Sequence, residues 1–195
     1  MALVDGVFAD AAKRSGTHLL CRAGCAQCCV GVFAIGPADA LRLQQGLAAL
    51  RHEDPERAGR LRERAATSWA SVAPQFPGNA TTGALELDPS GDPLDAFEHF
   101  ANHEPCPALD PEHGTCDLYA WRPQTCRVFG PPIVAGEGYG VCELCFQTAT
   151  PQEVAQAAIT PPSEDHSRTL DEAAVAAGAT PGATIVAFVL QAEVG

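Results

Sequence analysis

Apolar residues recur at the spacing of an α-helix in several separate stretches of the chain. The first stretch runs from Leu3 to Arg14 and ends before Gly16, a residue typical of helix ends. Two further helices are expected to begin at Pro37 and just after Asp54, because proline suits the first turn of a helix. Both carry an apolar stripe along one face, the second one from Leu61 to Val72. We therefore expect a helical hairpin whose stripes contribute to the core.

The remaining pattern predicts shorter elements separated by loops. Residues 73–92 are rich in Pro, Gly, Thr and Asn, which is typical of a loop. The final apolar run, Ala183 to Leu190, fits a strand or a helix equally well. The other expected elements are a buried strand at Val30–Ile35 and helices at Pro93–Asn102, Pro151–Ile159 and about Thr169–Ala177. Together these elements predict a helix-rich α+β fold with short strands.

The chain has 195 residues, of which 46% are hydrophobic, and this is enough for one domain with a sizeable core. Its 18 Gly and 16 Pro indicate many loops. We expect one domain over residues 1–150, with the helical hairpin inserted at about 37–102. A C-terminal helical extension, residues 151–195, is expected to pack on the same domain.

The chain is acidic, with 12 Lys and Arg against 24 Asp and Glu and a net charge of −12. That balance argues against binding to nucleic-acid phosphates or to an anionic membrane surface. Acidic residues gather between Ala65 and Trp121, a stretch without Lys or Arg, and again beyond Gly130. We interpret these stretches as solvated acidic faces, and a docking surface for a basic protein partner is the alternative.

No secretory signal is visible, because Asp5 and Asp10 interrupt the start of the chain, and the run Ala183–Leu190 is too short to span a bilayer. We therefore expect a cytoplasmic protein. In that reducing compartment nine cysteines are poor candidates for disulfides, and an odd number cannot all pair within one chain. Metal ligation explains them better than the alternative, in which they are small buried hydrophobic residues.

Four cysteines lie close together in a C-x3-C-x2-C-C pattern, at Cys21, Cys25, Cys28 and Cys29. Such short gaps let backbone turns direct successive thiolates at one point, as a tetrahedral metal ion or an iron–sulfur cluster requires. Adjacent cysteines are expected to send their side chains in different directions, so Cys28 and Cys29 should not both bind one mononuclear metal. One of them would then belong to a second centre or stay free.

The remaining thiolates must come from farther along the chain, at Cys106, Cys116, Cys126, Cys142 and Cys145, the last two in a C-x2-C pair. All nine cysteines are therefore candidate metal ligands. A centre that joins both cysteine blocks would link the chain across the helical hairpin and stabilise the fold.

These two blocks carry a family resemblance. The second block reads Cys106-Pro-Ala-Leu-Asp and then Gly114-Thr-Cys-Asp-Leu-Tyr-Ala-Trp-Arg-Pro-Gln-Thr-Cys-Arg-Val-Phe129. With the first block it resembles the YkgJ-like family of bacterial cysteine-cluster proteins, described as zinc- or iron-chelating domains, over residues 21–36 and 105–145. The resemblance implies metal or iron–sulfur binding, and some relatives are linked to lysine methylation of flagellin.

The second block contains two arginines. Arg122 and Arg127 are the only Lys or Arg residues between positions 65 and 167, and both lie beside Cys126 in the sequence. We interpret them as cations that lower the cost of burying negatively charged metal thiolates. The alternative is an ion pair with Asp110 or Asp117.

Cysteine ligation suits both zinc and iron–sulfur clusters. Clustered cysteines with remote partners favour an iron–sulfur cluster, [4Fe–4S] in particular, over zinc, whose sites usually show paired C-x2-C knuckles. The first three cysteines also match the spacing in radical S-adenosylmethionine enzymes, but the chain lacks the alternating strands and helices that such enzymes need. His99 and His103 are interpreted as part of a solvated helix face.

Three functions follow from these patterns. The first is a metal-cluster protein for electron transfer, sensing or metal delivery. The second is a structural zinc module whose helical hairpin or acidic surface binds a protein partner. The third is a cluster-dependent enzyme, either methyltransferase-like or an oxidoreductase.

Overall fold

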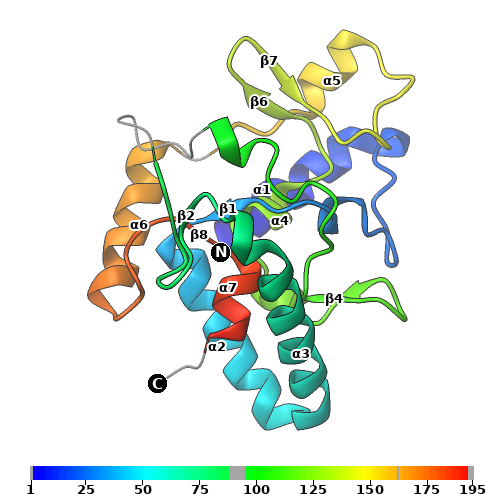
Figure 1. Ribbon diagram of the computed structural model, residues 1–195. Coiled ribbons are helices and arrows are strands. Elements are labelled where there is room, and N and C mark those ends of the chain that lie inside the picture. Colours follow the sequence, from blue (N-terminus) through cyan, green and yellow to red (C-terminus); the bar gives the residue numbers. More distant parts are fainter. Residues whose placement is uncertain (1, 88–94, 162, 193–195) are drawn as a thin grey trace.

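The computed structural model describes residues 2–87, 95–161 and 163–192 (Figure 1). The helices in these ranges are α1 (Ala2–Ser15), α2 (Pro37–Glu53), α3 (Pro55–Val72), α4 (Gln124–Val128), α5 (Pro151–Ala157), α6 (Glu164–Ala176) and α7 (Val186–Gln191). Short 3-10 helices are η1 (Gly16–His18), η2 (Gln27–Cys29), η3 (Ala73–Gln75), η4 (Asp95–Phe97) and η5 (Tyr119–Trp121). None of the helices in the described residues is long and apolar enough to cross a membrane.

The strands are short and pair antiparallel. The pairs within the described residues are β1 (Ala34–Ile35) with β8 (Thr184–Ile185), β2 (Gly78–Asn79) with β3 (Ala84–Leu85), β4 (Leu109–Asp110) with β5 (Thr115–Cys116), and β6 (Ile133–Ala135) with β7 (Gly138–Gly140). Short paired strands among longer helices confirm the predicted helix-rich α+β fold.

Helices α2 and α3 form the predicted hairpin, and α7 packs against both of them (Figure 1). The start of α3 is capped by the Asp54 side chain, which accepts a hydrogen bond from the backbone N–H of Arg57 at 3.0 Å. The start of α2 lies against α6, where the Asp171 carboxylate accepts a hydrogen bond from the backbone N–H of Ala38 at 2.9 Å. Both hairpin helices therefore begin where the sequence predicts.

The main hydrophobic core lies between α2, α3 and α7. Leu43, Leu61 and Leu190 are almost completely buried in it. The final apolar run supplies both β8 and α7, because Ile185 first pairs with Ala34 across a sheet and the helix begins at the next residue. The sequence pattern of this run fits a strand or a helix equally well, and the structure contains both, a strand followed by a helix.

A separate hydrophobic cluster lies toward α1 and α5. Its buried members are Cys142, Cys145, Phe146 and Ala157. Helices α1 and α5 contact each other beside it, and the Arg14 Nε donates a hydrogen bond to the Gln156 carbonyl at 2.7 Å. This part of the molecule is therefore organised around its own small core.

Two predicted elements differ in the structure. The strand expected at Val30–Ile35 is reduced to β1, with Val30 forming an isolated bridge to Pro105. Of the helix expected at Pro93–Asn102, positions 93 and 94 lie outside the described residues, and the rest forms η4 followed by turns. Ala101 adopts a left-handed backbone conformation with φ of 51°, which is incompatible with a continuing α-helix.

Candidate metal centre

Backbone hydrogen bonds join the two cysteine blocks directly. The Cys106 N–H donates to the Cys29 carbonyl at 2.7 Å, and the Gly31 N–H donates to the Glu104 carbonyl at 2.9 Å. These bonds surround the isolated bridge between Val30 and Pro105. Residues from opposite sides of the helical hairpin are thereby held next to each other, and Cys29 is brought beside Cys106.

The β4–β5 hairpin carries the next cysteine. Cys116 pairs with Leu109 in the strand register, so it lies close to the turn that follows Cys106. At the tip of the hairpin, Gly114 has φ of 64°, and a Cβ placed on it would lie 3.3 Å from the Gly24 carbonyl oxygen. Glycine is needed here because the hairpin tip packs closely on the loop of the first cysteine block.

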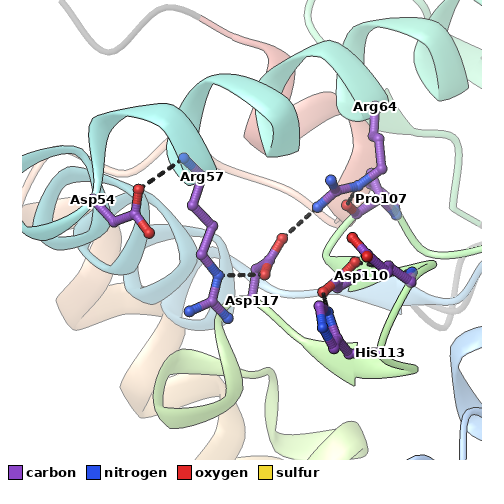
Figure 2. Close-up of polar contacts among 8 residues, drawn as sticks. Asp54, Arg57, Arg64, Pro107, Asp110, His113 and Asp117 are labelled. Atoms are coloured by element: carbon purple, nitrogen blue, oxygen red, sulfur yellow. Dashed lines mark hydrogen bonds and ion pairs between the residues drawn. The ribbon is translucent and has the colours of Figure 1, made fainter.

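Two arginines of α3 hold this hairpin through one buried carboxylate (Figure 2). Asp117, next in the chain to Cys116, has a side chain that is only 2% exposed. Its carboxylate accepts a hydrogen bond from the Arg57 Nε at 2.5 Å and another from Arg64 Nη2. Arg64 Nε also donates to the carbonyl of Pro107 at 2.9 Å. The two ion pairs and the hydrogen bond to Pro107 therefore hold both cysteine-bearing turns against α3.

Sequence reasoning missed this role of Arg57 and Arg64. Both arginines alternate with acidic residues along α3, a pattern that is typical of a solvated helix face. Their partner is about fifty residues or more away along the chain. The available signal was Asp117 itself, an acid directly beside a candidate ligand in a stretch without Lys or Arg.

Five cysteine thiols affect one another's protonation and form what we call the five-thiol group: Cys28, Cys29, Cys106, Cys116 and Cys126. A hydrogen bond between the two adjacent thiols lowers the pKa of Cys28 to about 6 and raises the pKa of Cys29. Burial raises the pKa of Cys106 to about 12 and also raises the pKa of Cys126, and neighbouring thiols add to both rises. The five thiols therefore lie within range of one another's charge.

Backbone N–H groups are directed at the sulfur atoms of this group. The nearby N–H groups of Ala108 and Leu109 oppose the rise in the pKa of Cys106 that burial causes. Burial likewise raises the pKa of Cys116, against the effects of the Leu118 N–H and of the positive charge of Arg122. Such donors favour the thiolate, which is the form that binds metal.

The two arginines beside Cys126 have different surroundings. Arg122 stacks over the Tyr119 ring at 3.8 Å, and its charge acts on the thiols of Cys28 and Cys116. Arg127 is 5% exposed and pairs with Asp5 of α1 at 2.5 Å. The alternative ion pairs with Asp110 or Asp117 are therefore wrong for Arg127, since Asp117 pairs with α3 and Asp110 with His113.

The other four cysteines form a four-thiol group: Cys21, Cys25, Cys142 and Cys145. Burial raises the pKa of Cys21 to about 12, and the thiols of Cys145, Cys25 and Cys142 add to that rise. The backbone N–H of Leu20 donates to the Cys145 Sγ at 3.4 Å. The Cys145 N–H donates to the Cys142 carbonyl at 2.9 Å, which closes the C-x2-C pair into a tight turn.

All nine cysteines are free thiols. As they stand, no three Cys, His, Asp or Glu side chains of the described residues are arranged to hold one metal ion. The donor set nevertheless fits zinc or iron, because it consists of sulfur atoms with N–H groups directed at them. His99 and His103 are exposed and lie in turns, and neither belongs to these groups.

A comparison with known protein families identifies this arrangement of cysteines. The sequence model of the CxxCxxCC family, described as a "Putative zinc- or iron-chelating domain", matches residues 20–145. The chain belongs to this family. The match spans about two thirds of the chain and contains every cysteine, together with the α2–α3 hairpin. No curated protein and no solved structure matches the chain.

Membership of the chelating-domain family confirms the cysteine-cluster resemblance that the sequence indicates. It supports cysteine-based chelation of zinc or iron as the function of this domain. The matched range covers both thiol groups and the hydrogen bonds that join the two blocks.

Proposed function

We propose that the five-thiol group holds an iron–sulfur cluster, [4Fe–4S] in type, and that the protein is a redox protein that transfers electrons. The observation that carries this proposal is the main-chain contact that places the adjacent cysteines Cys28 and Cys29 beside Cys106, whose N–H donates to the Cys29 carbonyl at 2.7 Å. A single tetrahedral ion that used both sulfur atoms would place adjacent residues on one metal, which strains them. A cluster offers separate iron atoms to the two thiolates.

The group supplies enough thiols for a cluster of this kind. The group contains five thiols, one more than a [4Fe–4S] cluster or a tetrahedral zinc ion binds. When bound, such a cluster supplies one-electron chemistry. The protein contributes the N–H groups of Ala108, Leu109 and Leu118, which lower the cost of placing negative charge among partly buried sulfur atoms.

The exposure of the five-thiol group is compatible with electron exchange. Each of its five cysteines is partly, not completely, buried. Val30, directly after Cys29, is 50% exposed, and Tyr119, which is 64% exposed, lies under the Arg122 guanidinium. A cluster at this depth would lie near the surface, where a redox partner could approach it.

The test is the content of iron, zinc and acid-labile sulfide in protein purified without oxygen, combined with electron paramagnetic resonance after reduction. We expect iron and sulfide in equal amounts, about four of each per chain for a [4Fe–4S] cluster, and a reduced-cluster signal. Cys126→Ser is expected to lose both elements, whereas Cys142→Ser, from the other group, should keep them. Protein that holds zinc and no sulfide would overturn the proposal and favour the structural zinc module.

A further inference from the structure

A polar hollow lies between α3 and the β4–β5 hairpin, beside the ion pairs of Asp117 (Figure 2). Its volume is about 350 Å³, which falls in the range of clefts that hold small molecules, about 300–1,000 Å³. Each described residue that lines it has a polar or charged side chain, and no cysteine is among them. The hollow therefore suits a hydrophilic ligand and presents no thiol to it.

The α3 side of the hollow consists of three arginines, Arg57, Arg60 and Arg64, which share one helix face at spacings of three and four residues. The Arg57 guanidinium contacts Asp117 through its Nε at 2.5 Å, so both of its Nη groups lack a hydrogen-bond partner among the described residues. Arg60 is exposed and forms no ion pair within the same ranges. Two guanidinium groups of this face can therefore donate to a ligand.

The β4–β5 hairpin forms the opposite side of the hollow. The Nδ1 of His113 pairs with the Asp110 carboxylate at 2.6 Å, which leaves Nε2 as the remaining polar atom of the ring. Thr115 adds a hydroxyl group, and Glu112 adds a carboxylate that makes no ion pair in the part of the chain that the structure describes. Potential donors therefore lie on both sides of the hollow, with a carboxylate acceptor beside them.

We infer that this hollow binds a small molecule that carries both a phosphate group and hydroxyl groups, as a sugar phosphate does. Guanidinium groups match the geometry of phosphate oxygens, so Arg57 and Arg60 hold the phosphate group. Donors on two sides suit a tetrahedral phosphate better than a planar carboxylate, which a single guanidinium can satisfy. The inference goes beyond the proposed function and does not depend on which metal the thiols bind.

The acidic residues of the hollow decide between a free phosphate ion and a phosphorylated molecule. Asp110, Glu112 and Asp117 face the same space as the arginines, and their charges repel a free phosphate dianion. Carboxylate oxygens accept hydrogen bonds from hydroxyl groups, however, and Glu112 is the one with no ion-pair partner among the described residues. A ligand with hydroxyl groups next to its phosphate uses both kinds of side chain.

The experiment is calorimetric titration of the full-length chain, in buffer without phosphate and at constant ionic strength, with glucose-6-phosphate, inorganic phosphate and glucose. We expect glucose-6-phosphate to bind more tightly than inorganic phosphate, and glucose not to bind. Arg60→Met should weaken the binding of glucose-6-phosphate by at least about tenfold, because it removes a charged donor. Arg168→Met removes the same charge from an exposed position of α6 and should bind the sugar phosphate as the wild type does.

A second measurement needs no variant. The NMR signal of the Arg57 side-chain Nε–H should shift when glucose-6-phosphate is added to the wild-type chain. Absence of glucose-6-phosphate binding, equal binding of inorganic phosphate, or equal weakening in Arg60→Met and Arg168→Met would overturn the inference. Metal and sulfide are measured in the same samples and should be equal in all three chains. Loss of metal together with binding in Arg60→Met would also overturn it, since the ligand would then bind to the metal.

Discussion

The backbone N–H of Cys106 donates a hydrogen bond to the carbonyl of Cys29, and this 2.7 Å contact joins two cysteine blocks that the helical hairpin separates in the sequence. The contact uses main-chain atoms, so it does not depend on the thiols or on bound metal. The contact therefore holds Cys29 beside Cys106 through the main chain alone. The predictions that follow concern the elements that hold this arrangement.

Arg64 fixes both cysteine-bearing turns, through the Asp117 carboxylate and the Pro107 carbonyl. Replacing it in Arg64→Met keeps much of the packing but removes hydrogen bonds to a nearly buried carboxylate. We expect a loss of about 2 kcal/mol in the free energy of unfolding, measured with urea. Arg60→Met, at an exposed position of the same helix, is the control and should change stability by less than about 0.5 kcal/mol. Equal effects from the two substitutions would contradict the role given to Arg64.

The pKa of His113 depends on a contact within the β4–β5 turn. Its Nδ1 lies 2.6 Å from the Asp110 carboxylate, which raises the pKa of His113 and lowers the pKa of Asp110. A raised histidine pKa stabilises the fold below the unfolded value of about 6.5, and this contribution is lost as pH rises through the folded value. A lowered Asp110 pKa stabilises the fold above about 3.9 and is lost in more acidic solution.

The His113–Asp110 pair therefore stabilises the fold mainly between about pH 3.9 and about pH 6.5. An NMR titration should give a His113 pKa above its ordinary value, and Asp110→Asn should return it to that value. An unchanged His113 pKa in Asp110→Asn would show that the contact does not form in solution.

Gly46 of α2 lies against Trp121, next to Arg122. A Cβ on Gly46 would lie 2.5 Å from the Trp121 Cγ, closer than real contacts allow. We expect Gly46→Ala to cost about 1–3 kcal/mol through overpacking. Gly59→Ala in α3 is the matched control, since a Cβ there meets nothing within 4 Å. That substitution should instead stabilise the chain by about 0.5–1 kcal/mol. Thermal unfolding of both variants checks the opposite signs.

Removal of metal should loosen the cysteine-bearing loops while leaving the hairpin core intact. The core formed by Leu43, Leu61 and Leu190 is built from α2, α3 and α7, none of which contains a cysteine. We expect amide hydrogen exchange to accelerate around Cys145 and Cys116 after chelation, with protection retained in α2 and α3. Global loss of protection would mean that metal is required for the whole fold.

The local parts of this fold could be predicted from the sequence. Pro37 and the Asp54 cap mark the beginnings of α2 and α3, because such signals act within one helical turn. The prediction of a helix ending near Asn102 was wrong, because the apolar residues there pack as an aromatic cluster and not along one face of a helix. Phe97 and Phe100 pack together, and Phe100 also packs on Phe76, while Ala101 reverses the chain.

The candidate site could be predicted in its residue types and not in its grouping. The C-x3-C-x2-C-C pattern identifies the thiols, but which thiols share a group depends on contacts made across the hairpin. The same limit applies to the partners of Arg127 and Asp117, found on α1 and α3. A local sequence pattern cannot predict these ion pairs, because they form between elements that are distant in the sequence and meet only when the chain has folded.

Each thiol group draws its sulfur atoms from both ends of the matched range, one set before the α2–α3 hairpin and the other after it. During synthesis on the ribosome, the first four cysteines therefore emerge long before their partners. The five-thiol group becomes complete only when Cys126 has left the exit tunnel, and the four-thiol group only after Cys145. On the proposed ligation, metal loading must follow translation of nearly the whole domain, because metal that reaches the nascent chain earlier meets only an incomplete set of thiols.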